Sequence, residues 1–283
     1  MSIPMETITE APIQTETGFD WRKLNGVLVL ECLPLEADGF TNAFSTRLGG
    51  VSPMPEKDLN LAGFADDTTE NIYENRRRFL GVFEDTWKLT SCWQVHGDAV
   101  RHVTDHDDAG NDEERCDALI CNTTGILVGV KTADCVPVLI GDRRTGAFSA
   151  IHAGWRGTVN SIVQKTIDHM KQEFDSRAED LRAAIGPAAG VCCYEVGADV
   201  IGTFEKEFGE VGHLFSETRT GHARVDLRRA NMEQLLLAGL EPERIHSTDL
   251  CTMCSTDIFF SYRREKRDYG MTGRLMSVIG KRR

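Results

Sequence analysis

The central part of the chain constrains the fold most strongly, because it combines apolar strands, a hairpin turn and a helix in close succession. Residues 125–142 (GILVGVKTADCVPVLIGD) form two apolar runs of strand length that the tripeptide ADC interrupts. Residues 142–146 (DRRTG) predict a hairpin turn that returns into a strand over residues 147–153. The helical spacing of the next apolar positions predicts a helix that includes Val159, Ile162, Val163, Thr166, Ile167, Met170 and Phe174.

The flanking regions predict a mixed sheet rather than a purely parallel one, because strands occur both in hairpins and between helices. Thr68 or Thr69 and Asp226 are the expected N-caps of two of the helices. The other expected elements are strands over residues 26–33, 42–52, 181–187 and 275–280, two short strands over residues 89–103 that are broken at His96–Gly97, and helices over residues 68–83, about 197–208 and about 226–240.

The chain shows no internal repeat, low-complexity tract or Pro-rich linker that would divide it. Residues 1–20 hold few large apolar residues and no periodicity, which predicts a mobile N-terminal arm. We therefore expect one domain over residues 21–283 that follows this arm.

Composition excludes several classes of function. The formal net charge of −12 opposes a broad nucleic-acid interface and binding to an anionic membrane surface. No apolar run approaches the roughly 18 residues of a membrane span, and the N-terminus lacks the basic and apolar segments of a secretory signal. We therefore expect a cytoplasmic protein, whose nine cysteines are reduced thiols.

Four of these cysteines form two close pairs. Cys251 and Cys254 form a lone CxxC without the second pair that a zinc site of this type requires. On a regular strand, the neighbouring Cys192 and Cys193 would point to opposite faces. This favours a place in the core or in a pocket wall for Cys192 and Cys193.

His96, Cys135 and His152 are the candidate site residues with the clearest chemistry. They lie in QVHG (94–97), TADC (132–135) and IHAGWRG (151–157), and are 39 and 17 residues apart, which fits no zinc-finger pattern. Two imidazoles and a thiolate are usual ligands of zinc or copper, and three protein ligands leave one coordination position open. By spacing alone, two hydrogen-bonded histidines and a small buried cysteine remain an equal alternative.

Four motifs resemble a known family, the YfiH-like proteins. These are also called the multicopper polyphenol oxidoreductase (laccase-domain) or purine nucleoside phosphorylase family. The resemblance begins at about Phe44 and continues to the C-terminus. It rests on ADCVPVLI (133–140), AIHAGWRGT (150–158), IGPAAGVCCYEVG (185–197) and FFSYRR with TGR (259–264 and 272–274).

The resemblance implies a fold, a cofactor and an activity. The expected fold class is α/β (α+β), a single-domain layered sandwich with mixed β-sheets flanked by helices. His96, Cys135 and His152 are expected to ligate a metal, zinc in the first place and copper as the alternative. The implied activities are phosphorolysis of adenosine, inosine and methylthioadenosine, and adenosine deamination. The expected partners are a purine nucleoside and phosphate, with the chain as a monomer or homodimer.

Other residues near these motifs are candidates for substrate binding. Arg156 follows His152 closely and is suited to hold a phosphate or carboxylate. Arg47 precedes a Gly-Gly pair and is a second candidate for a pocket residue, which the resemblance supports. Trp155 and Tyr194 could stack on a ring, although core packing is the commoner role of a single aromatic residue.

Asp134 and Glu195 complete the catalytic candidates. If the strand alternates, Asp134 faces away from its neighbour Cys135, which also leaves a structural role open. Glu195 could act as a general acid or base, or could orient a metal ligand.

Two other functions compete with the nucleoside enzyme. Cys135 and His152 could form the nucleophile and base of a hydrolase, and the resemblance extends to peptidoglycan editing factors. A polyphenol oxidase of the laccase type would need a copper cluster rich in His-x-His pairs. The chain has eight His and none of these pairs, which makes laccase chemistry the weakest alternative.

Overall fold

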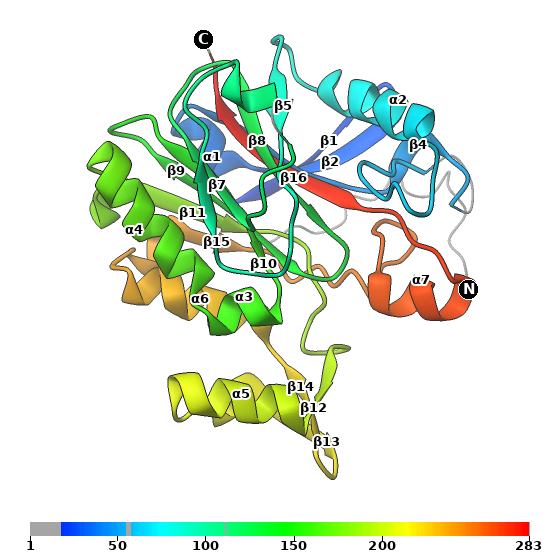
Figure 1. The fold of residues 1–283 in the computed structure, drawn as a ribbon, viewed down its shortest axis with the longest axis vertical. Helices are drawn as coiled ribbons and strands as arrows, with labels where there is room; N and C mark the ends of the chain where they lie inside the picture. Colours follow the sequence, from blue (N-terminus) through cyan, green and yellow to red (C-terminus); the bar gives the residue numbers. More distant parts are fainter. Residues whose placement is uncertain (1–17, 55–57, 111, 283) are drawn as a thin grey trace.

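The structure is a computed structural model that describes residues 18–54, 58–110 and 112–282. Its core consists of two six-stranded mixed sheets packed face to face (Figure 1). The first sheet has the order β1 (Phe19–Leu24), β2 (Val27–Cys32), β3 (Phe40–Ser45), β16 (Leu275–Lys281), β8 (Ile126–Thr132) and β5 (Lys88–Thr90). The second has the order β15 (Ile245–Ser247), β11 (Leu181–Ile185), β9 (Val136–Asp142), β10 (Phe148–Ala153), β7 (Ala118–Cys121) and β6 (Val100–His102).

Helices cover the outer faces of both sheets. The second sheet is covered by α4 (Ile162–Phe174) and α6 (Leu227–Leu237), and the first by α2 (Thr69–Leu80) (Figure 1). Short helices α1 (Leu33–Ala37) and α3 (Trp155–Val159) lie at strand ends. The expected mixed sheets flanked by helices are therefore confirmed.

A smaller part extends from this sandwich. A three-stranded sheet of β12 (Glu195–Gly197), β14 (His222–Val225) and β13 (Phe215–Arg219) carries α5 (Ala198–Phe208) and forms a separate lobe (Figure 1). The short strand β4 (Leu48–Ser52) and the helix α7 (Tyr262–Tyr269) complete the set of strands and α-helices in the described residues.

The local signals placed most of these elements correctly. Thr68 caps α2 by accepting a hydrogen bond from the backbone N–H of Asn71, and Asp226 caps α6 in the same way through Arg229. The helix predicted from residue 159 onward is instead two helices, because Ser161 adopts a left-handed conformation that separates α3 from α4. Residues 1–17 of the expected arm lie outside the described residues, and its end is in fact β1, where Phe19 is buried.

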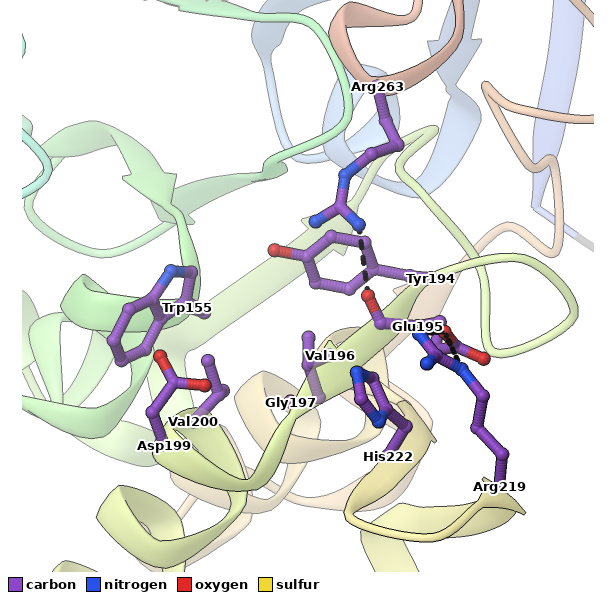
Figure 2. A pocket seen from close by; sticks show the side chains of 10 residues that line it. All are labelled: Trp155, Tyr194, Glu195, Val196, Gly197, Asp199, Val200, Arg219, His222 and Arg263. Carbon is purple, nitrogen blue, oxygen red and sulfur yellow. Dashed lines mark hydrogen bonds and ion pairs between the residues drawn. The ribbon is translucent and has the colours of Figure 1, made fainter.

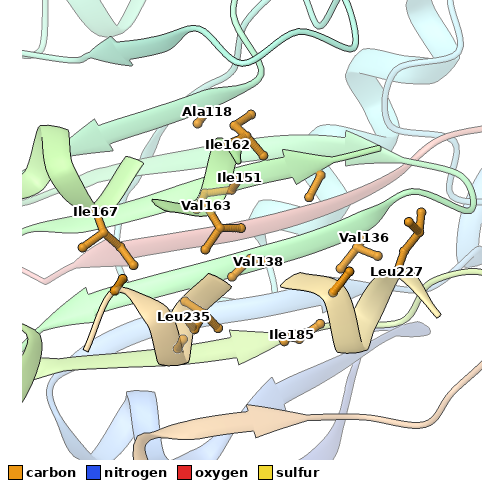
Figure 3. Close-up of a cluster of buried hydrophobic side chains, with 14 of the residues drawn as sticks. Ala118, Val136, Val138, Ile151, Ile162, Val163, Ile167, Ile185, Leu227 and Leu235 are labelled. Atoms are coloured by element: carbon orange, nitrogen blue, oxygen red, sulfur yellow. The ribbon is translucent and has the colours of Figure 1, made fainter. Parts of the chain in front are cut away.

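The apolar core has one layer between the two sheets and one layer on each outer face. The layer under α4 and α6 contains β-branched side chains from β9 and β10 that contact both helices (Figure 3). The layer between the sheets contains Leu30, Phe44, Val130, Leu139, Phe148 and Ile279. Within the described residues, no helix is long and apolar enough to cross a membrane.

Leu139 and Leu237 provide a matched test of this packing. Leu139 on β9 is fully buried between the sheets, whereas the Leu237 side chain at the end of α6 is 77% exposed. We expect Leu139→Ala to lower the free energy of unfolding by about 2–5 kcal/mol, because it leaves a cavity in the core. Leu237→Ala should change it by no more than about 0.5 kcal/mol. Urea unfolding measures both values, and equal effects would contradict the layered core.

Candidate metal centre

The structure brings His96, Cys135 and His152 together. One nitrogen of each imidazole and the Cys135 sulfur all lie within 4.8 Å of one another. The two imidazole rings meet edge to face with their centroids 4.9 Å apart. His152 lies on β10 opposite Pro137 of β9, so Cys135, just before β9, reaches the same end of the second sheet.

Cys135 occupies the point where the chain passes from one sheet to the other. Residues 133–135 join β8 of the first sheet to β9 of the second, and Asp134 adopts a φ of 88° to make this bend. The Asp134 carboxylate accepts hydrogen bonds of 2.7 Å from the Thr252 hydroxyl and from the backbone N–H of Arg263 in the first turn of α7. These contacts give Asp134 a structural role beside the cluster.

Asp117 holds two of the three clustered residues in place, although no motif in the sequence indicated this role. This fully buried carboxylate lies 2.7 Å from Nδ1 of His152. It also accepts the backbone N–H groups of Val95, His96 and Gly97 at 2.7–3.1 Å. The three bonds hold the QVHG loop in place and stabilise the left-handed conformation of His96, at φ 58°.

Two glycines leave the space that the cluster needs. A Cβ atom on Gly154 would lie 3.2 Å from the Cys135 sulfur and 3.1 Å from the His96 ring. A Cβ atom on Gly157 would lie 2.9 Å from the carbonyl oxygen of Gly97. The small residues of HAGWRG therefore allow close approach of the backbone at this site.

Without a bound ion, the interactions within the cluster favour a thiolate on Cys135 beside a protonated His152. Burial opposes ionisation of Cys135, but the charges and hydrogen bonds of His152 and His96 outweigh it and lower the thiol pKa to about 6. Burial also disfavours the charged form of His152, but Cys135 and Asp117 outweigh it and raise the His152 pKa to about 9. A cysteine that is ionised near neutral pH is ready to act as a metal ligand or a nucleophile.

A cavity of about 330 Å³ is lined on one side by Trp155 and Tyr194 (Figure 2). Trp155 follows Gly154, which approaches Cys135 closely. Burial and then the nearby Cys135 thiolate raise the pKa of Tyr194 to about 12. The remaining lining residues are Glu195, Val196, Gly197, Asp199, Val200, Arg219, His222 and Arg263.

Arg263 is a pocket residue whose position the sequence did not indicate. The run RREKR is typical of solvated surface charge, but Arg263 lies over the Tyr194 ring, 5.1 Å from its centroid. Its guanidinium donates a 3.0 Å hydrogen bond to the carbonyl oxygen of Glu195 (Figure 2). Its place in the resembling motif FFSYRR was the only sequence signal for this role.

The contacts of Glu195 oppose its predicted role as a general acid. Its carboxylate accepts hydrogen bonds from Arg219 and Thr218, and these bonds lower the pKa of Glu195. The side chain therefore stays ionised around neutral pH and has no proton to donate. It lies at the edge of the cavity next to Arg219 (Figure 2).

Arg47 also differs from its predicted role as an anion-binding residue. Its buried guanidinium donates to the carboxylates of Asp58 and Glu265 and to the carbonyl oxygens of Thr256 and Met54. These partners occupy the guanidinium, which supports a structural role that ties α7 to the segment after β4. Removing Arg47 would leave two buried carboxylates without their cation.

Arg156, by contrast, remains available to a ligand. Its exposed guanidinium lies over the Trp155 ring, 4.3 Å from the centroid. Within the described residues no carboxylate forms an ion pair with it. Arg156 and Arg263 thus place two positive charges beside the two aromatic residues of the site.

Comparisons with known proteins give a consistent result. A family model described as multi-copper polyphenol oxidoreductase laccase matches residues 41–282. The chain is 40% identical over 245 residues to a purine nucleoside phosphorylase of Deinococcus radiodurans, covering 84% of this chain and 88% of the relative. It is 33% identical over 254 residues to the purine nucleoside phosphorylase YlmD of Geobacillus stearothermophilus, covering 86% and 91%. The crystal structure of that YlmD superposes with a TM-score of 0.85 at 31% identity, covering 94% of this chain and 99% of the other.

Asp117→Asn tests whether the buried carboxylate positions the cluster. An amide cannot accept all the bonds that the carboxylate accepts, so His152 and the QVHG loop should lose their fixed orientation. We expect the affinity for zinc to fall about 10- to 100-fold, as measured by competition with a chromophoric chelator.

Asp142→Asn is the matched control for this change. Asp142 is equally buried, but it accepts backbone N–H groups of Arg144 and Thr145 at the far end of β9. This variant should keep the wild-type zinc affinity. If both variants weaken zinc binding equally, Asp117 has no specific positioning role.

Proposed function

This chain belongs to the multi-copper polyphenol oxidoreductase laccase family, and on that basis we propose that it is a metal-dependent purine nucleoside phosphorylase. The observation that supports this most directly is the cluster of His96, Cys135 and His152 beside a cavity with aromatic walls. Two imidazoles and a thiol whose pKa is lowered form a donor set that fits zinc, with copper as the alternative. A zinc ion held there would supply a Lewis acid at an open coordination position.

The cavity fits the proposed substrate in size and chemistry. Its volume of about 330 Å³ lies at the lower end of the range for small-molecule pockets. Trp155 and Tyr194 offer aromatic faces for a purine ring. With its pKa raised to about 12, the Tyr194 hydroxyl keeps its proton at neutral pH and can donate a hydrogen bond to the ring.

The reaction places a second demand on the site, because phosphate must be held beside the ribose. A phosphate oxygen bonds to C1′ as the bond from C1′ to the purine nitrogen breaks, and the purine leaves with the proton that hydrogen phosphate gives up. Arg156 and Arg263 are the residues that we assign to phosphate, since neither guanidinium forms an ion pair with a carboxylate in the described segments. The proposal includes adenosine, inosine and methylthioadenosine as substrates, and adenosine deamination as a further activity.

A cysteine hydrolase that edits peptidoglycan precursors is the second candidate. One observation favours it: Asp117, His152 and Cys135 form an acid–imidazole–thiol series of the kind that activates a nucleophile. In this function His96 would have no direct role, although the bond from its backbone N–H to Asp117 holds it in the loop beside the other two residues. We therefore rank it below the nucleoside enzyme.

Substitution of the two arginines tests the proposed phosphate site. With zinc-loaded protein, adenosine and phosphate should give adenine and ribose 1-phosphate. Arg156→Gln and Arg263→Gln should each raise the apparent KM for phosphate about tenfold, and raise that for adenosine less, because a charge-assisted hydrogen bond is lost. Product chromatography at varied phosphate concentrations measures both constants.

Arg267→Gln is the matched control on the same helix, α7. The Arg267 side chain is 67% exposed and pairs with its neighbour Asp268, so this variant should behave like the wild type. The proposed function fails if zinc-loaded protein leaves adenosine, inosine and methylthioadenosine unchanged both with and without phosphate.

Alkylation of Cys135 distinguishes a metal ligand from a nucleophile. A thiolate bound to an ion should resist iodoacetamide until a chelator removes the ion. After chelation, labelling should rise with pH around a midpoint near 6, because only the thiolate reacts and the thiol pKa is lowered to about 6. Peptide mass spectrometry locates the label. Rapid labelling of untreated, active protein with parallel loss of activity would favour the hydrolase.

A further inference from the structure

A second cluster of metal-binding side chains lies outside the site described above. The sulfur atoms of Cys192, Cys193, Cys251 and Cys254 all lie within 4.8 Å of one another. Cys254 is 3.6 Å from Cys192 and 3.3 Å from Cys193, sulfur to sulfur. In a tetrahedral zinc site with Zn–S bonds of ~2.3 Å, the sulfurs are separated by ~3.8 Å. We propose that these four cysteines hold a structural zinc ion in a closed tetrathiolate site.

The backbone around Cys192 and Cys193 explains how two neighbouring residues can face one ion. The alternation expected for a strand does not apply here, because residues 191–193 form a turn that precedes β12. The backbone N–H groups of Cys193 and Tyr194 both donate to the carbonyl oxygen of Gly190 at 2.9 Å. This tight turn brings both sulfurs to the side on which Cys254 lies.

The CxxC pair has the backbone geometry that supports a metal-bound thiolate. Cys254 and Ser255 donate their N–H groups to the carbonyl oxygen of Cys251 at 3.1 Å, which closes the turn. The Cys251 sulfur in turn accepts the N–H of Gly190 at 3.2 Å, together with the N–H groups of Met253 and Cys254. These donors stabilise negative charge on the sulfur that an ion would share.

Space and charge around the cluster fit the same assignment. A Cβ atom on Gly190 would lie 3.2 Å from the Cys192 sulfur and 3.0 Å from Nη2 of Arg228. The Arg228 guanidinium therefore reaches the edge of the cluster, where it also donates to the carbonyl oxygens of Thr248 and Leu250. Four thiolates and one divalent cation carry a net charge of about −2, which this guanidinium partly offsets.

The proposed ion would join two loops that have little apolar packing of their own. The apolar cluster of this region contains the buried residues Ala189, Cys251 and Met253, with Cys193 and Tyr194 packed against them. Both loops also bond to Asp134, through the backbone N–H of Ala189 and the Thr252 hydroxyl. A closed site would therefore fix Tyr194 in the wall of the cavity and support the bend that presents Cys135.

Metal counting on intact protein tests this proposal without any assay of activity. Protein purified under reducing conditions and without chelator should contain about two zinc ions per chain, since each cluster binds one ion. Cys254→Ser and Cys192→Ser, both at exposed positions, should each lose one ion. Ser255→Ala, in the same turn, is the matched control and should keep both.

The His96→Ala variant separates this proposal from the proposed function. It should lose only the ion of the first cluster and retain one ion that Cys254→Ser then removes. Cobalt(II) bound in place of that remaining zinc should show the intense sulfur-to-metal absorption of a tetrathiolate site. The metal count and the absorption spectrum do not depend on whether the protein cleaves nucleosides.

Two results would overturn the tetrathiolate site. One is a folded Cys254→Ser protein, judged by circular dichroism, with the zinc content of the wild type. The other is a disulfide from Cys254 to Cys192 or Cys193, found by peptide mass spectrometry in protein purified under reducing conditions.

Discussion

The buried carboxylate of Asp117 is the constraint on which the candidate site depends. It accepts three consecutive backbone N–H groups of the QVHG loop and contacts Nδ1 of His152. A buried, ionised carboxylate is stable only when such donors surround it, so the loop and the histidine must keep this arrangement. The orientation of the His152 ring and the position of the loop that carries His96 therefore both depend on one fully buried residue.

A second constraint comes from the passage between the two sheets. β8 and β9 are neighbours in the chain but belong to different sheets, so the bend at Asp134 must be held by bonds from outside it. Those bonds come from the α7 terminus and from the loops that carry the four cysteines. The proposed structural zinc and the His96–Cys135–His152 site thus share one supporting residue, and ordering of the cysteine loops would also order the cavity wall.

Charge is distributed in the site according to burial. Arg47 lies in the interior and is neutralised by two carboxylates, whereas Arg156 and Arg263 lie over the rings of Trp155 and Tyr194. A guanidinium on an aromatic face keeps its donors directed outward, where an anion can reach them. This difference in environment, rather than the residue type, assigns the anion-binding role in the proposal.

Local sequence determined the elements whose signals are contained within one turn or one strand. The period over residues 162–174 and the caps at Thr68 and Asp226 could be predicted, and so could the donor types that His96 and Cys135 offer. The tertiary structure alone decided the partners of Asp117, the burial of Arg47 and the meeting of two cysteine pairs that lie about 60 residues apart in the chain. The physical reason is that periodicity reports which face of an element is buried. Which distant side chains converge depends on how the two sheets pack and where the chain crosses between them.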